Sequence, residues 1–171
     1  MMQLELKSKS RTGIFNEIQQ YIEILGLTIV SSDFERPWGG FFVIDESQAK
    51  QFAELFFTSA SAIANNLSIK LSPKVLVVEP CKRLSWQYHS RRAEIWQTIS
   101  GTVRVVTSLT NDENKDTTLS SGEGISLAQG ERHRLIGLSN WGVVAEIWQH
   151  TDPDFPSDES DIIRLQDDFG R

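Results

Sequence analysis

The feature that most constrains this fold is a succession of short β-rich segments that begins near residue 73. Turns containing Gly, Ser, Asn or Asp separate these segments, which are rich in Val, Ile and Trp. They cover residues 74–78, 84–89, 94–99, 102–108, 124–128, 132–138 and 142–150. Their spacing of roughly 8–12 residues, without helical patterns between them, predicts an antiparallel β-barrel or sandwich. The polar segment 110–116 (TNDENKD) is typical of a solvated hairpin loop.

Two amphipathic segments precede the strands. Isoleucines at helical spacing predict a helix over residues 14–25, and Gly26 is a natural end for it. Residues 46–57 predict a second helix with Asp45 as its N-cap. With 171 residues in all, the chain is expected to form one domain.

The charge balance argues against a general nucleic-acid-binding protein, because such a protein carries a basic face. Lys and Arg number 17 and Asp and Glu 23, which gives a net charge of −6. Residues 1–149 hold 15 basic and 16 acidic residues, whereas residues 150–171 hold 2 and 7, so the acidity belongs to the C-terminal segment. The sequence also contains no Gly-rich phosphate loop, dinucleotide fingerprint or Cys-x-x-Cys pair.

We expect a cytoplasmic protein with no membrane association. No apolar run approaches the roughly 18 residues of a membrane span, and the N-terminal residues lack the order of a signal peptide. The single cysteine, Cys81, excludes an intramolecular disulfide and suits a reducing compartment. We interpret it as a small buried residue, and the glycosylation-like triplet Asn66-Leu67-Ser68 as a chance match.

Two of the three histidines lie in contexts that could bind a metal. Strand alternation puts Gln87 and His89 on one face, Glu94 follows after a short link, and His133 begins a later strand. Two imidazoles, a carboxylate and an amide oxygen would form a divalent metal site with open positions. The spacing alone equally allows both histidines to be ordinary core or surface residues.

These residues resemble the two motifs of the cupin superfamily. Gln87 stands at the first histidine position of the first motif, with Ala128 and Gly137 replacing the usual Pro and Asn of the second. The matching positions are Gln87, His89, Glu94, Gly101, Gly122, Gly130 and His133. The resemblance implies a mainly β fold, a single jelly-roll barrel, with one divalent metal ion (Zn, Mn, Fe, Co or Ni) held by Gln87, His89, Glu94 and His133.

More specifically, the chain is similar to the type II mannose-6-phosphate isomerase domain, over roughly residues 34–171. Residues 1–33 would then be a helical N-terminal extension. The matches are Arg36-Pro37-Trp38-Gly39, Lys74, Leu84-Ser85, Gln87, His89, Arg92-Ala93-Glu94, Trp96, Gly101-Thr102, residues 130–134, Glu146, Gln149, residues 161–164 and the ending 167–171. In bifunctional relatives this domain follows a guanylyltransferase, for which 171 residues leave no room.

The departures from that family leave the metal ligands intact and bear on the identity of the substrate. Pro80-Cys81 stands where the family has Pro-Gly, Ser90-Arg91 where it is rich in His, and Ile95 where His is common. The acidic tail that follows His150 is longer than the family's usual linker.

The resemblance implies a metal-dependent aldose–ketose isomerase acting on a phosphorylated sugar, most simply mannose 6-phosphate, in carbohydrate and polysaccharide precursor metabolism. Glu146, on a strand face with Trp148 and His150, is the candidate base, and Arg92 is the candidate for assisting proton transfer near the carbonyl. Glu146 could equally be an exposed or ion-paired strand residue.

Five cations are candidates for binding the phosphate, because guanidinium groups in particular bind phosphate bidentately. They are Lys74, Arg83, Arg132, Arg134 and Arg164. A solvated basic surface is the alternative for each of them. Arg132 and Arg134 flank His133 and should point away from it in a regular strand. The resemblance further suggests that Arg164 and Arg171 close over the barrel mouth.

Alternative functions remain open. One is a phosphoheptose isomerase-type activity on a seven-carbon sugar phosphate, and another is epimerisation on the same barrel. The third is a non-catalytic sugar-binding module, which Ser90-Arg91 and Ile95 favour because the isomerase pattern has more histidine there. The five tryptophans are expected mainly in barrel packing, with Trp96 as the one candidate to line a sugar pocket. A homodimer is also expected, since cupins commonly pair.

Overall fold

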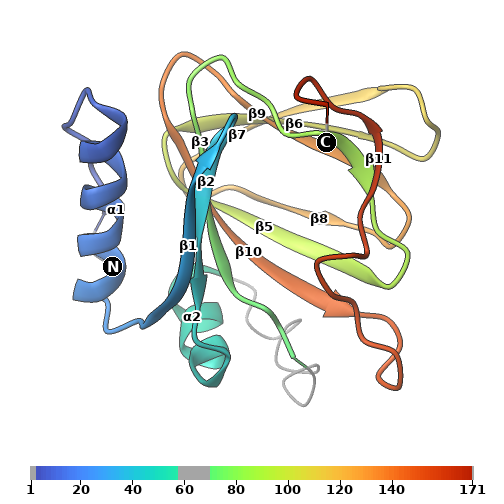
Figure 1. Ribbon diagram of the computed structural model, residues 1–171, viewed down its shortest axis with the longest axis horizontal. Helices are drawn as coiled ribbons and strands as arrows, with labels where there is room; N and C mark the ends of the chain where they lie inside the picture. Colours follow the sequence, from blue (N-terminus) through green and yellow to red (C-terminus); the bar gives the residue numbers. More distant parts are fainter. Residues whose placement is uncertain (1–2, 58–69, 171) are drawn as a thin grey trace.

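The computed structural model describes residues 3–57 and 70–170, which form two facing antiparallel β-sheets (Figure 1). The larger sheet contains, in spatial order, β1 (Ile29–Arg36), β2 (Gly39–Ile44), β3 (Lys74–Val78), β10 (Gly142–His150), β5 (Arg92–Ser100) and β8 (Gly124–Leu127). The smaller contains β11 (Ile163–Gln166), β4 (Trp86–Tyr88), β9 (Arg132–Gly137), β6 (Thr102–Ser108) and β7 (Lys115–Ser120). This confirms the predicted mainly β jelly roll, in which no pairing between described strands joins the two sheets.

The central strands of the larger sheet are apolar along their length because both of their faces are covered. In β3, Val75 and Val77 pack with the helices, whereas Leu76 and Val78 pack between the sheets. β10 repeats this alternation, and all five residues of β3 are buried. Burial on both faces accounts for the unbroken Val and Leu run that predicted this strand.

The same alternation directs polar side chains into the space between the sheets. Lys74 belongs to the Leu76 face of β3, and Glu146 pairs in register with it from β10. On its other side Glu146 pairs with Trp96 of β5, and Glu94 lies two residues along on the same face of that strand. Charged groups from three adjacent strands are therefore buried together.

The helices cover the outer face of the larger sheet. Helix α1 (Arg11–Ile24) packs Ile18 and Ile22 into the same apolar cluster as β3 and β10, and it lies beside β1 and β2 in Figure 1. The Ser10 side chain accepts the Gly13 N–H and begins the helix, three residues before the predicted start. Gly26, with φ of +76°, follows its end as predicted.

The second predicted helix begins with a short 3-10 turn, η1 (Glu46–Gln48), and continues as α2 (Ala49–Phe56). Asp45 caps it as predicted, by accepting the Ser47 N–H. Its apolar face, which includes Phe52, joins the cluster beneath the larger sheet. None of the helices in the described ranges is long and apolar enough to cross a membrane.

Arg11 connects α1 to the β1–β2 turn. Its guanidinium Nη2 donates to three backbone carbonyl oxygens, those of Phe34 at 2.8 Å, Arg36 at 2.7 Å and Gly39 at 2.7 Å. Its Nη1 contacts the Glu79 carboxylate at 2.5 Å. This one side chain therefore fixes the turn that carries Arg36 and its neighbours.

Several elements differ from the sequence prediction. Strands β1, β2, β7 and β11 were not predicted, and β7 begins inside the segment expected to be a loop. β1, β7 and β11 are mostly exposed edge strands with polar sequences, so they lack the apolar alternation that identifies a strand. Cys81 is exposed rather than buried, in a turn where its φ is +60°. β1 crosses the expected boundary at residue 33, and Asn66 and Arg171 lie outside the described residues.

Candidate functional site

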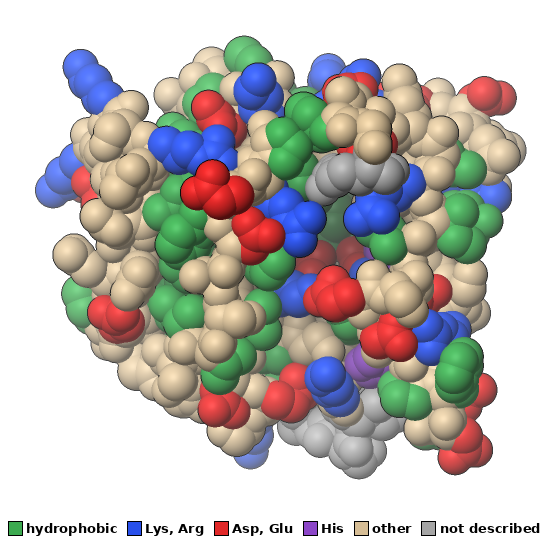
Figure 2. Space-filling view, in the orientation of Figure 1, with side chains coloured by type: hydrophobic (Ala, Val, Ile, Leu, Met, Phe, Trp, Pro, Cys, Tyr) green, Lys and Arg blue, Asp and Glu red, His purple; other side chains and the backbone are tan. Residues whose placement is uncertain are grey.

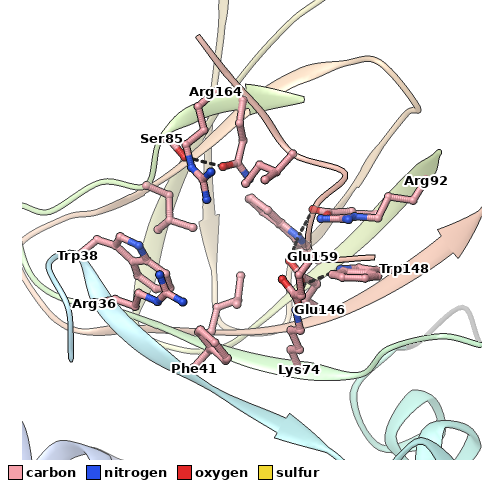
Figure 3. Close-up of a pocket in the computed structure, with 16 residues that line it drawn as sticks. Arg36, Trp38, Phe41, Lys74, Ser85, Arg92, Glu146, Trp148, Glu159 and Arg164 are labelled. Atoms are coloured by element: carbon pink, nitrogen blue, oxygen red, sulfur yellow. Dashed lines mark hydrogen bonds and ion pairs between the residues drawn. The ribbon is translucent and has the colours of Figure 1, made fainter. Parts of the chain in front are cut away.

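A cavity of about 120 Å³ opens between the two sheets. Side chains of β1 to β5, of β10 and of the C-terminal segment line it, including Glu94, Glu146, Lys74 and Arg164. Figure 2 shows the hollow in this face of the molecule, with basic and acidic side chains around it. Figure 3 shows that these groups converge from opposite walls.

Three buried side chains at the inner end of the site are placed to hold a metal ion. His89, Glu94 and His133 are each 2% exposed, and one ligand atom from each lies within 4.8 Å of the others. Nε2 of His89 lies 3.1 Å from Oε1 of Glu94, and Nε2 of His133 lies 3.6 Å from Oε2. Both oxygens of one carboxylate thus face an imidazole nitrogen.

Hydrogen bonds to backbone carbonyls orient both rings. Nδ1 of His89 bonds to the Asp161 carbonyl oxygen, and Nδ1 of His133 bonds to that of Glu131 at 3.0 Å. Because a carbonyl oxygen only accepts, each Nδ1 carries the proton of this bond, and Nε2 of His133 keeps its lone pair available. In metal sites, a hydrogen bond from the non-ligating ring nitrogen fixes the orientation of the histidine in this way.

The donor set fits a divalent transition metal. Nε2 of His133 is buried, with no hydrogen-bond partner among the residues that the structure describes, as expected of a nitrogen reserved for a ligand. Two imidazole nitrogens and a carboxylate suit Zn, Mn, Fe, Co or Ni. Gln87, the fourth predicted ligand, lines the cavity and pairs in register with His133, and its Oε1 accepts the Ser85 hydroxyl at 2.5 Å.

Arg92 lies directly beside this triad. Its Nε donates to Oε1 of Glu94 at 2.8 Å, and its Nη2 lies 3.2 Å from Nε2 of His89. The guanidinium stacks 3.6 Å from the centre of the Trp148 ring. Arg92 therefore contributes a fixed positive charge beside the triad, in the wall of the cavity.

The electrostatics of the triad keep it ready to bind a cation. Burial opposes ionisation of Glu94, but the His89 and His133 rings and the Arg92 guanidinium outweigh it and hold the pKa of Glu94 below its usual range. Burial lowers the pKa of His133 to about 4, against the attraction of Glu94. At neutral pH the site therefore presents an anionic carboxylate and a neutral His133 imidazole.

Glu146 is a second buried carboxyl with the opposite behaviour. Burial and the charge of Glu94 raise its pKa to about 7, and Lys74 and Arg92 only partly offset them. Its two oxygens accept the indole N–H groups of Trp96 and Trp148, each at 3.0 Å. A carboxyl that is half ionised near neutral pH can both accept and return a proton.

The predicted phosphate-binding cations separate into two groups. Lys74 and Arg164 line the cavity, and Figure 3 shows both directed toward it. Arg83, Arg132 and Arg134 are not among the lining residues. Their guanidinium groups bind Asp168, Asn111 and Glu113 respectively, and Arg132 and Arg134 point away from His133 as expected.

Arg36 was not singled out as a site residue, although its Arg36-Pro37-Trp38-Gly39 segment matched the family. The β1–β2 turn carries Arg36 and Trp38 to the wall opposite Lys74 (Figure 3). Arg36 also forms an ion pair with Asp33, Nε to Oδ2 at 2.8 Å. The β1–β2 hairpin that carries Arg36 was not predicted, because the polar sequence of β1 does not indicate a strand. Without that hairpin, Arg36 could not be placed at the cavity.

The acidic tail after β10 crosses this site as a strap, here defined as residues 155–161. The Asp161 carboxylate accepts the backbone N–H groups of Ser90 and Arg91, each at 2.9 Å. Ser157 and Asp158 accept bonds from Arg92 Nη1 through a hydroxyl and a carbonyl oxygen, at 2.9 and 3.1 Å. The strap thereby holds both the β4–β5 link and Arg92, besides orienting His89.

The facing sheets and the buried His-Glu-His triad define a cupin-type protein. The sequence model of the family described as "Mannose-6-phosphate isomerase C-terminal" matches residues 56–167, and the chain belongs to that family. A comparison with curated proteins finds no match.

Among the solved structures that match, the similarity to oxalate decarboxylase supports the fold alone. Oxalate decarboxylase from Bacillus subtilis matches with a TM-score of 0.54 and 14% identity, over 79% of this chain and 30% of its own length. A cupin 2 conserved barrel domain protein from Salinispora arenicola matches with a TM-score of 0.41 and 18% identity, over 47% of this chain and 64% of its own.

Proposed function

We propose that this protein is a metal-dependent aldose–ketose isomerase that acts on a phosphorylated sugar, most simply interconverting mannose 6-phosphate and fructose 6-phosphate. The observation that carries this proposal is that Glu146, with its pKa near 7, lines one cavity together with Glu94 of the triad and with two cations, Lys74 and Arg164. Family membership supports the same reaction class.

The reaction moves one proton between adjacent sugar carbons, so it needs no external oxidant. Glu146 takes the proton from C2 of the aldose and returns it to C1, while a hydroxyl proton moves from O2 to O1. A divalent ion held by His89, Glu94 and His133 would supply a Lewis acid for the carbonyl oxygen. Trp96 and Trp148 fix the Glu146 carboxyl through their indole N–H groups.

The cations of the cavity would have two roles, binding the phosphate and stabilising charge that develops during the reaction. Lys74, Arg36 and Arg164 line the same cavity and would bind the phosphate. Arg92 lies nearer the triad and would stabilise negative charge that develops on the oxygens during proton transfer.

The test is a product-resolved assay of the metal-loaded protein on a panel of hexose and heptose phosphates. We expect isomerisation of at least one substrate and a loss of roughly 100-fold or more in kcat for Glu146→Gln, in the range for removing a general base. Glu54→Gln, which changes an exposed carboxylate of α2, is the matched control and should retain full activity. Absence of turnover on the entire panel would overturn the proposal, and an epimer as product would reassign the reaction.

A further inference from the structure

Lys74 and Glu159 form an ion pair whose two partners differ sharply in exposure. The Lys74 side chain is 8% exposed and the Glu159 side chain 75% exposed. The Lys74 ammonium lies 4.3 Å from the centre of the Trp148 ring and 5.6 Å from that of Phe41. Among the described residues, Glu159 is the one carboxylate paired with this enclosed cation.

Glu159 can leave Lys74 without loosening the strap that carries it. The neighbouring residues Asp158 and Asp161 hold the strap through their bonds to Arg92 and to the β4–β5 link. The side chain of Glu159 makes no other hydrogen bond or ion pair within the described part of the chain. Across residues 3–57 and 70–170, only the ion pair with Lys74 therefore holds the Glu159 carboxylate, whereas bonds from its neighbours hold the backbone.

The cavity is small for the ligand class proposed above. Its volume of about 120 Å³ lies below the roughly 300–1,000 Å³ that is usual for small-molecule sites. Glu159 is one of its lining residues and stands at the mouth with Lys74, across from Arg36 and Arg164 (Figure 3). Moving this side chain enlarges the mouth and also removes a negative charge that would repel an anion.

We propose that Glu159 is a tethered counter-ion, and that a phosphate-class anion replaces it on Lys74 when a ligand binds. The anion then lies among Lys74, Arg36 and Arg164, and Glu159 turns outward into solvent. This deepens the proposed function, because it names where the phosphate of the substrate binds and which protein group it must displace. It makes Glu159 a determinant of affinity and selectivity for anions, without a part in the chemistry.

Equilibrium binding of inorganic phosphate to the intact protein at pH 8 tests this directly, by calorimetry and by the fluorescence of Trp148 beneath Lys74. Glu159→Gln should bind phosphate roughly fivefold or more tightly than the parent protein, since the competing ion pair is gone. Asp154→Asn removes the same charge from an exposed residue of the same tail and should change the affinity by less than about twofold.

A second pair of variants ties the effect to Lys74. In a Lys74→Met background, Glu159→Gln should give no gain in affinity. The proposal falls if Glu159→Gln binds no more tightly than Asp154→Asn, if the gain persists without Lys74, or if no variant binds phosphate. The readout is binding, so an inactive protein that shows the expected pattern would refute the isomerase function and leave this inference intact.

Discussion

Glu94 and Glu146 share a single hydrogen-bond donor, the indole N–H of Trp96. The nitrogen lies 3.2 Å from Oε2 of Glu94 and 3.0 Å from Oε2 of Glu146. The two carboxyls nevertheless have opposite pKa shifts. Imidazoles and a guanidinium outweigh the effect of burial on Glu94, whereas burial and the charge of Glu94 together raise the pKa of Glu146. At neutral pH the Glu94 carboxyl is therefore an anion, whereas the Glu146 carboxyl is near the midpoint of its titration.

Replacing this donor should destabilise the site. Trp96→Phe leaves two buried carboxyls without it, and we expect a loss of about 2–4 kcal/mol in the free energy of unfolding. Trp141→Phe is the control, since that indole packs at the edge of the apolar cluster beside α1. Chemical denaturation of both variants measures the difference, and equal losses would contradict a special role for the shared N–H.

The pKa of Glu146 predicts how stability depends on pH in the metal-free protein. Folding raises this pKa from 4.5 to about 7, so the folded state holds a proton that the unfolded state has released. Stability contributed by the protonated group is complete below pH 4.5 and is lost as the pH rises to about 7, at a cost of about 3 kcal/mol. Glu146→Gln should therefore gain stability relative to the parent across this range. Chemical denaturation of both proteins at pH 4.5 and pH 8 tests this. The prediction is contradicted if the difference in the free energy of unfolding between Glu146→Gln and the parent is the same at both pH values.

The triad predicts metal content. We expect about one divalent ion per chain in protein loaded with Zn or Mn. Elemental analysis should find that His89→Ala and His133→Ala lose this ion. The control is His150→Gln, because His150 lies outside the triad and accepts the Ser157 N–H, a bond that glutamine can preserve. Loss of metal from all three variants, or from none of them, would contradict the assignment of the triad as the metal site.

Asp161 should affect both stability and metal affinity. Asp161→Ala leaves two backbone N–H groups unsatisfied, at a cost of about 2–4 kcal/mol, and loosens the carbonyl that orients His89. Metal affinity should fall by roughly 10–100-fold, as is usual when a group that orients a metal ligand is lost. Limited proteolysis should cut the strap faster, whereas Asp112→Ala, in the exposed loop 110–114, should leave metal affinity and stability unchanged.

Arg11 should contribute more to stability than an ordinary surface arginine. Arg11→Met removes three contacts to carbonyl oxygens and one to Glu79, so we expect a loss of about 2–4 kcal/mol. Arg104→Met removes an exposed ion pair with Asp116 and should cost less than about 1 kcal/mol. Thermal unfolding of the two variants compares them, and similar melting temperatures would contradict the role assigned to Arg11.

The elements that could be predicted from the sequence are those with a local pattern of apolar residues. β3 shows an apolar run after Lys74, β10 shows apolar segments on both sides of Glu146, and α1 shows isoleucines at helical spacing. The resemblance to the cupin motifs predicted that His89, Glu94 and His133 lie together, which their spacing alone left open. Edge strands such as β7 carry no such pattern, because one side of them meets water.

Which cations face the cavity could not be read from the sequence for a different reason. Arg83 and Arg164 look equivalent along the chain, yet Arg83 is held by Asp168, which lies 85 residues away. Arg36 reaches the cavity because of the Arg11 contacts to its hairpin, which no local pattern encodes. Contacts with residues far away in the sequence determine these orientations. A single sequence does not show which distant residues will be in contact.

The bond from His89 to the Asp161 carbonyl also sets an order of events during synthesis. The two residues are 72 positions apart, so at roughly 5–20 residues per second His89 emerges about 4–14 s before the group that orients it exists. The sheets are formed by strands that are almost all made earlier, and pairings over such separations form slowly. The nascent chain can thus form most of its sheets first, and His89 gains the carbonyl that orients its ring only near the end of synthesis.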